Sequence, residues 1–85
     1  ANVLTPAGST SYLRLTGGPL TINSITAGKG GDLLILENTT SNNVTVNANI
    51  GNIKLEIASL VLGLNDVLTL IWDGSAWVEI GYANN

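Results

Sequence analysis

Residues 68–82, LTLIWDGSAWVEIGY, contain two apolar runs that flank the sequence Asp73-Gly74-Ser75. Short apolar runs on either side of an Asp-Gly pair are typical of a β-hairpin. We therefore predict a hairpin over residues 67–82 that closes the domain. Trp72 and Trp77 are its expected anchors, because a buried tryptophan removes about 150–250 Å² from water.

Two strand registers are compatible with this hairpin. Pairing Leu70 with Ile80 brings like faces together and leaves residues 74–76 as the loop. The core side of the hairpin would then consist of Leu68, Leu70, Trp72, Val78, Ile80 and Tyr82. A two-residue loop would instead place Leu70 opposite Glu79, so we favour the first register.

The favoured register has consequences for the two tryptophans. It predicts a bulge near Asp73 and Gly74, and it places Trp77 on the opposite face from Trp72. One tryptophan would then be core, and the other would be free to cover an edge or contact a neighbouring subunit. An exposed tryptophan beside an acidic residue can also stack on a sugar ring, which makes Trp77 and Asp73 candidate glycan contacts.

The rest of the chain also indicates strands and turns. Val, Ile, Leu and Thr dominate the periodic segments, and ten Gly and frequent Asn separate them. Expected strands are residues 2–5, 11–15, 20–25, 33–37, 44–47, 53–57, 59–62, 67–72 and 77–82. This spacing predicts an all-β fold, a small antiparallel β-sandwich of jelly-roll type. An intertwined triple-stranded β-prism is the alternative.

Two of these strands are apolar on both faces. In LLILE, residues 33–37, both alternating sets are aliphatic, and VLTLIW, residues 67–72, is similar. A sheet with one wet face should alternate apolar and polar residues, so we expect a second cover at a subunit interface. Expected structural and oligomer residues are Leu34, Leu36, Ile53, Leu55, Leu68, Leu70, Trp72, Asp73, Gly74, Trp77, Ile80 and Tyr82.

Composition points the same way. The 85 residues carry a net charge of −3, with 45% hydrophobic and only 11% charged residues. A chain this short buries only about 60–65% of its unfolded surface as a monomer, which favours an oligomer. Three scattered cations, Arg14, Lys29 and Lys54, cannot form a nucleic-acid surface, and charged residues interrupt the apolar stretches, so we expect no membrane insertion.

The sequence offers little for catalysis. It contains no His and no Cys, so imidazole bases, catalytic triads and His/Cys metal sites are excluded. Six carboxylates remain, and nothing in their spacing sets the geometry of a glycosidase pair or a calcium site. We therefore expect no enzyme activity, no cofactor and no metal. Asp66 and Asp73 stand beside turns, where carboxylates bond local backbone N–H groups.

The segment NDVLTLIWDGSAWVEIG, residues 65–81, resembles the carboxy-terminal segment of bacteriophage tailspike and tail-fibre proteins. These chains often end in a G-D-T-L-T-L-I-Y-D-G-x-x-W-x-E pattern. Residues that match are Asp66, Leu68, Thr69, Leu70, Ile71, Asp73, Gly74, Trp77 and Glu79. Asn65 stands where the pattern has Gly, and Trp72 stands where it has Tyr. Upstream, residues 33–55 resemble the same family, so the likeness covers residues 30–81.

The resemblance implies a module that folds as a parallel homotrimer, closes the distal end of a fibre in the virion, and supports attachment to the host. The alternative function is a carbohydrate-binding module for a host-surface polysaccharide. Residues 1–29 would be amino-terminal strands and an entry segment, and residues 30–82 the family-like domain. Because Met is absent, even at position 1, we expect the single domain of residues 1–85 to be part of a longer chain.

Overall fold

The computed structural model describes residues 3–5, 12–17 and 19–85, which form ten strands and no helix. The all-β class is thus confirmed. Asn2 and Ser11, which begin the first two expected strands, lie outside the described residues, and the described part of the chain has no helix suited to crossing a membrane. The strands are β1 (Val3–Leu4), β2 (Tyr12–Leu15), β3 (Leu20–Ile22), β4 (Ser24–Ile25), β5 (Leu33–Asn38), β6 (Val44–Asn47), β7 (Ile53–Lys54), β8 (Ser59–Leu62), β9 (Val67–Trp72) and β10 (Trp77–Ala83).

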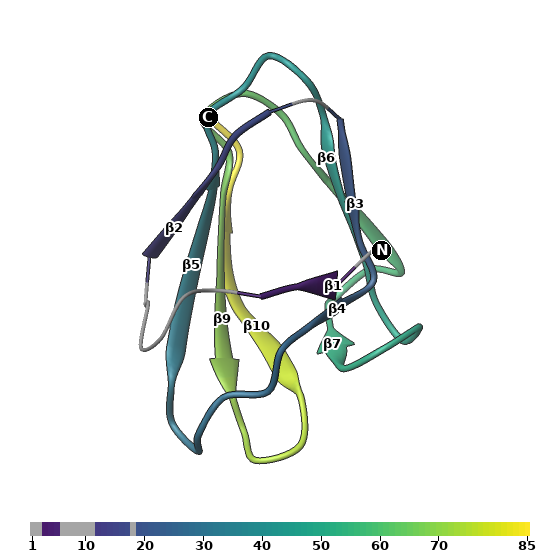
Figure 1. The fold of residues 1–85 in the computed structure, drawn as a ribbon, viewed down its shortest axis with the longest axis vertical. Helices are drawn as coiled ribbons and strands as arrows, with labels where there is room; N and C mark the ends of the chain where they lie inside the picture. The colour runs from purple at the N-terminus through teal and green to yellow at the C-terminus, as the bar shows by residue number, and fades with distance from the viewer. Residues whose placement is uncertain (1–2, 6–11, 18) are drawn as a thin grey trace.

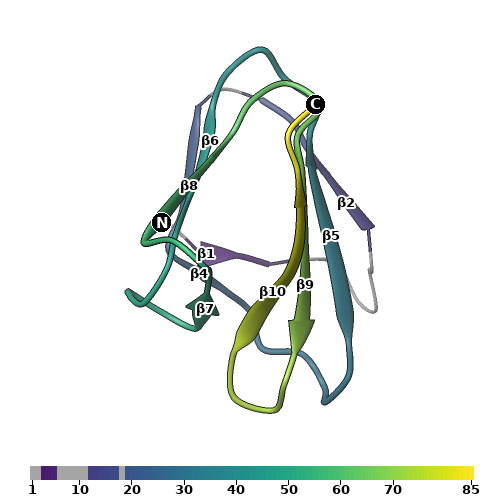
Figure 2. The ribbon, with the colours of Figure 1, turned by 180° about the vertical axis from the view of Figure 1, so that it is seen from behind.

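Two sheets pack face to face in a sandwich (Figure 1). The larger sheet has the order β2-β5-β9-β10-β7, and the smaller has the order β3-β6-β8. A third, two-stranded sheet of β1 and β4 lies between them in both views (Figures 1 and 2). The predicted sandwich is therefore present.

The antiparallel arrangement that we predicted is only partly correct, because the sheets are mixed. The pairs β1–β4, β2–β5, β3–β6 and β7–β10 are parallel, whereas β5–β9, β9–β10 and β6–β8 are antiparallel. From β5 to β9 the chain alternates between the larger and the smaller sheet. Each parallel pair joins two strands that are three apart in chain order. Periodicity along the sequence does not indicate which sheet a strand will join.

The core lies between the two sheets and takes alternate residues from each strand, as the pleat requires. On β5 and β9 the inward side chains are fully buried, whereas the outward ones are half-buried or exposed. The buried apolar residues that form one cluster are Leu15, Ile22, Ile25, Leu34, Leu36, Val44, Val46, Ile53, Leu60, Leu62, Leu68, Leu70, Trp72 and Trp77. A single chain therefore builds a complete core from one face of each sheet.

The closing hairpin adopts the register that we did not favour. Leu70 lies opposite Glu79, and Trp72 lies directly opposite Trp77. Residues opposite each other in an antiparallel pair share a face, so our placement of the two tryptophans on opposite faces is wrong. Both are buried, with 7% and 4% of their surfaces exposed.

The loop explains this register. Four residues, 73–76, separate the strands, and the Asp73 N–H donates to the Ala76 carbonyl at 3.0 Å. The expected bulge exists, but it lies between Glu79 and Gly81 rather than at the turn. With Glu79 opposite Leu70, Ile80 lies on the outward side rather than on the core face that we predicted for it, and it is 57% exposed.

Two expected strands are shorter than predicted. The segment 20–25 bends at Asn23, so β3 belongs to the smaller sheet and β4 to the sheet of β1. Of the segment 53–57, only β7 is a strand. The side-chain amide of Asn52, which precedes β7, bonds the backbone of β4. Its Oδ1 accepts from the Ile25 N–H at 2.9 Å, and its Nδ2 donates to the Ile25 carbonyl. This amide joins β4 to the larger sheet.

The turn before β9 requires a left-handed residue. Asn65 has a φ of +67°, a conformation that Gly adopts freely and that Asn tolerates better than most residues. This conformation explains why the resembling pattern has Gly at this position. The Asp66 N–H then closes the turn by donating to the Gly63 carbonyl at 3.1 Å.

Candidate functional site

The closing hairpin places a pair of tryptophans at one end of the core. The ring centroids of Trp72 and Trp77 are 5.4 Å apart, and the ring planes are tilted by 59°. Nε1 of Trp77 donates to the Thr26 carbonyl at 3.1 Å, which ties β10 to the segment after β4. Gly28 lies against this ring, because a Cβ there would be 3.0 Å from Cζ2 of Trp77.

This placement bears on the predicted glycan contacts. Stacking on a sugar needs an open ring face, and Trp77 is buried in the described fold with its indole nitrogen already bonded. Sugar binding through Trp77 would therefore require the hairpin to open. Asp73 is exposed, but its carboxylate is engaged within its own turn.

Asp73 organises the four-residue loop, as we predicted for a carboxylate beside a turn. One oxygen, Oδ1, accepts from the Ser75 N–H at 2.9 Å and from the Ala76 N–H at 2.8 Å. These backbone hydrogen bonds, the one from Ser75 first, lower the pKa of Asp73. Gly74 has a φ of +106°, which an L side chain rarely adopts. Both residues therefore have structural roles in the turn.

Asp66 holds the end of the chain, and it is buried. Its Oδ2 accepts from the Gly63 N–H at 2.8 Å, which fulfils the predicted turn role, and from the Tyr82 hydroxyl at 3.2 Å. Its Oδ1 accepts from the Asn85 N–H at 2.9 Å. Partial burial and the Asp66 carboxylate raise the pKa of Tyr82. Hydrogen bonds therefore hold both ends of β10, through the Trp77 indole at its start and the Asp66 carboxylate at its end.

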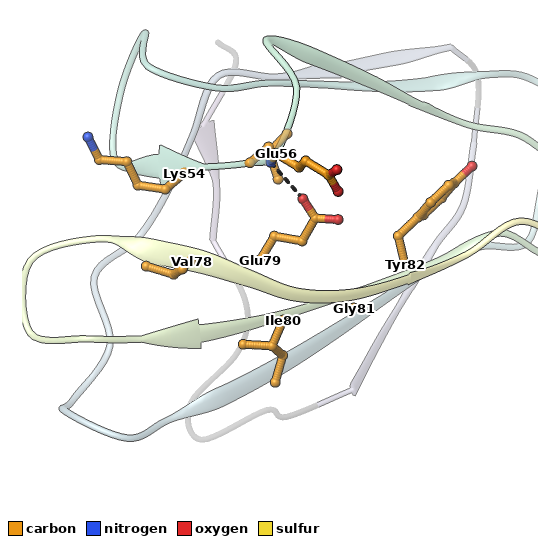
Figure 3. A pocket seen from close by; sticks show the side chains of 8 residues that line it. Lys54, Glu56, Val78, Glu79, Ile80, Gly81 and Tyr82 are labelled. Atoms are coloured by element: carbon orange, nitrogen blue, oxygen red, sulfur yellow. Dashed lines mark hydrogen bonds between the residues drawn. The ribbon is translucent and has the colours of Figure 1, made fainter.

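A groove of about 550 Å³ runs beside β10 (Figure 3). β7 pairs only with the first two residues of β10, so the chain then diverges from the strand and leaves a gap. Glu79 and Tyr82 point to the same side, and Oε1 of Glu79 accepts from the Glu56 N–H at 2.9 Å. Lys54 lies at one end, so the groove combines both signs of charge with an aromatic ring.

Apart from Asp73 and Gly74 of the turn, the predicted structural residues form three groups. Seven of them are part of the core within one chain and cannot also face a partner: Leu34, Leu36, Ile53, Leu68, Leu70, Trp72 and Trp77. Leu55 packs partly against the core. Ile80 is 57% exposed on the outward side, so our placement of it on the core face is wrong. Tyr82 shares the inward side with its partner Leu68, as predicted, but it is 37% exposed. The register with Glu79 opposite Leu70 turns Ile80 outward, and the bulge after Glu79 then brings Tyr82 to the side of Leu68, at the open edge of the sandwich.

Sequence reasoning missed two structural amides, Asn38 and Asn52. Asn38 is fully buried at the end of β5, on the same side as Leu34 and Leu36. An alternating pattern continued by one position would have predicted its burial. Asn52 had no such signal, because its partner, Ile25, is 27 residues away along the chain.

The chemistry available in the described fold is limited. Among the described residues no group of three or more acidic side chains could hold a metal ion. Every buried side-chain nitrogen or oxygen of these residues has a hydrogen-bond partner, so none is left pointing into an empty site. In the groove, the backbone N–H of Glu56 donates to the carboxylate of Glu79, so this contact does not pair the two carboxylates.

Comparison with known families identifies the sandwich. Residues 1–78 match the family described as Phage depolymerase C-terminal beta sandwich domain. The match covers more than nine-tenths of the 85 residues. No curated protein matches this chain.

Proposed function

Because this chain belongs to the phage depolymerase C-terminal beta sandwich family, we propose that it trimerises and stabilises the distal end of a phage tailspike or tail fibre. The module would support attachment to the host from the tail of the virion. It would have no active site of its own, and the depolymerase chemistry would reside outside these 85 residues.

The observation that carries this proposal is the apolar surface that stays exposed after one chain has formed its core. The core is closed within one chain, yet at least nine large apolar side chains of the described part are more than a third exposed. Only 11% of the residues are charged, whereas soluble domains are about a quarter charged. Scattered exposed apolar residues are ordinary, but in a chain so poor in charge they favour burial against other copies.

Light scattering across a hundredfold dilution tests the proposal. We expect a mass three times the 8.8 kDa of the chain, retained on dilution. A folded protein that stays at the mass of one chain would overturn it. Intrinsic tryptophan fluorescence in the same samples reports folding, because both tryptophans are buried.

The groove beside β10 favours a second function, binding of a host-surface polysaccharide. Tyr82 offers an aromatic ring, while Glu79, Glu56 and Lys54 offer polar groups for hydroxyls. Tyr82→Ala should then abolish binding on a glycan array while the oligomer mass is unchanged. Leu64→Ala is the matched control, because Leu64 is also exposed, at 51%, and does not line the groove. Equal binding by wild type and Tyr82→Ala would exclude this site.

A further inference from the structure

The outward side of the larger sheet carries a continuous aliphatic row. Leu33 of β5 is the register partner of Ile71 of β9, and Ile71 is the register partner of Val78 of β10. Partners in adjacent strands share a face, so these three side chains lie side by side across three strands. Leu33 is 45% exposed, and the other two are half-buried.

A second row extends this surface. Tyr12 of β2 is the partner of Ile35 of β5, which in turn faces Thr69 of β9. The bulge adds Ile80, which points to the side of β10 opposite Glu79 (Figure 3). We call the surface formed by Tyr12, Leu33, Ile35, Ile71, Val78 and Ile80 the apolar face.

The outward side of the smaller sheet is different. Its central row consists of Thr21 of β3, Thr45 of β6 and Val61 of β8. Two of these three are polar, as expected where strands of a sandwich meet water. The chain thus follows the alternation rule on one sheet and departs from it on the other, which singles out the apolar face.

Nothing in the described part of the chain covers the apolar face. The smaller sheet and the β1–β4 pair lie on the opposite, core side of β5, β9 and β10, and no described strand lies on the outward side (Figures 1 and 2). The strands β5 and β9, which are apolar on both sides, therefore lie at the surface of the domain rather than at its centre.

Charge favours another copy of this chain as the partner. The chain carries six carboxylates and a net charge of −3, so most approaches of two copies bring like charges together. Glu37 is the only carboxylate at an outward position of β2, β5, β9 or β10, where its partner is Arg14 and it accepts from the Tyr12 hydroxyl. Lys54 lies on the same side at the edge strand β7. Copies can therefore meet here without opposing carboxylates.

The size of the face is also suitable. Strand spacing of about 4.8 Å and a rise of about 3.4 Å per residue give β5, β9 and β10, each of at least six residues, a footprint of roughly 14 by 20 Å, which the four residues of β2 extend. A standard interface removes about 800 Å² from each partner, about a sixth of the 4622 Å² that this chain exposes. The apolar face can form the centre of such an interface, with the surrounding loops as its rim.

We propose that copies of this chain associate through the apolar face, packing the outward side of the larger sheet toward the assembly axis. The inference rests on the proposed oligomer and adds the surface that forms it. Val78 and Ile80 of the apolar face also line the groove beside β10, so the two surfaces adjoin at this strand.

The test compares single lysine substitutions by light scattering across a hundredfold dilution. Leu33→Lys and Ile80→Lys place a charge on β5 and on β10 within the apolar face, at positions already 45% and 57% exposed. Each should reduce the mass to that of one chain, or raise the dissociation concentration at least tenfold. Val61→Lys is the matched control, because Val61 is 47% exposed on the smaller sheet.

The outcomes separate this inference from the proposed function. Monomeric Leu33→Lys and Ile80→Lys with oligomeric wild type and Val61→Lys support it. Oligomers that persist in both face variants overturn it and leave the proposed trimer standing, with a different interface. A monomeric wild type overturns both. Tryptophan fluorescence confirms that each variant is folded, and Leu33→Asn or Ile80→Asn replaces the lysine variant at the same position if that variant is not folded.

Discussion

The side-chain amide of Asn38, the last residue of β5, bonds the carbonyl of Leu62, the last residue of β8, and so connects the two sheets. Its Nδ2 donates to the Leu62 carbonyl of β8 and to the Asn42 carbonyl, both at 2.7 Å. Its Oδ1 accepts from the Thr40 N–H at 3.0 Å and from the Thr40 hydroxyl at 2.8 Å. A fully buried amide with this many bonds fixes how the turn after β5 meets the smaller sheet, because an unpaired group there would be costly.

Asn38→Asp should destabilise the fold, by about 3 kcal/mol at neutral pH, because a buried charge would face two carbonyl oxygens. Burial raises the pKa of the new carboxyl above its unfolded value of about 3.9. The stability lost should therefore be smallest below that value and grow as the pH rises through the folded pKa. Urea unfolding from pH 3 to pH 7 measures this trend.

Asn43→Asp is the control for that substitution, because Asn43 is exposed in the same loop. It should change the free energy of unfolding by less than about 0.5 kcal/mol. Equal losses for the two variants, or a loss at position 38 that does not depend on pH, would contradict the role of the amide.

Trp77→Phe should lower the free energy of unfolding by about 1–3 kcal/mol. The change removes the indole N–H that bonds the Thr26 carbonyl and leaves that acceptor without its donor. Urea unfolding followed by the fluorescence of Trp72 gives the value. Ile50→Ala, at a position 66% exposed, should have almost no effect, and a similar loss for both variants would show that the indole bond contributes little.

Gly51→Ala should destabilise the domain, by about 1–3 kcal/mol, through overpacking. A Cβ at Gly51 would be 2.5 Å from Cβ of Ser24 and 2.7 Å from the Asn23 carbonyl oxygen. Because one of these neighbours is backbone, it cannot move aside easily. Gly30→Ala is the matched control, since a Cβ there meets nothing within 4 Å. Thermal unfolding should separate the two variants clearly, and identical midpoints would refute the close approach.

Asp73→Ala should lower the midpoint of thermal unfolding and change its dependence on pH. The backbone N–H groups of Ser75 and Ala76 depress the pKa of Asp73 in the folded state. The stabilisation is therefore present above the ordinary carboxyl pKa of about 3.9 and is lost as the pH falls through the folded value. Wild type and variant should differ at pH 7 and converge at low pH.

Ser75→Ala is the comparison for the turn, because it removes only the Ser75 hydroxyl, whose bond to Asp73 is 3.1 Å long. It keeps both backbone donors, so its effect should be smaller than that of Asp73→Ala. An NMR titration of the Asp73 carboxyl carbon should show a midpoint below the ordinary value. A normal midpoint would show that the turn does not stabilise the charge.

The sequence predicted the elements of this fold better than their pairing. Runs of apolar and β-branched residues between turn residues located β5, β6, β8, β9 and β10 to within one residue at each end. The predicted hairpin register was wrong because apolar matching favoured Leu70 with Ile80, whereas the four-residue loop sets Leu70 opposite Glu79 and leaves Ile80 on the outward side. Apolar side chains on both faces of a strand leave the register weakly specified by burial alone.

Local chemistry is sufficient to explain some details of the fold. Asp66 and Asp73 stand next to turns, and their short side chains reach nearby backbone, so their turn roles followed from the sequence. The pair formed by Trp77 and the Thr26 carbonyl did not, because 51 residues separate them. No local pattern encodes which distant carbonyl a side chain will meet.

The sequence alone is enough to predict an all-β sandwich and an excess of apolar residues. Strand propensity and turn residues can be read from short segments, and composition needs no knowledge of the fold. The three-dimensional arrangement was needed to show which side of β5 and β9 forms the core and which remains outward. It was also needed to show that the sheets are mixed and that Trp72 and Trp77 share one face. These features depend on how the chain winds between two sheets, and winding is a relation between segments far apart in the sequence.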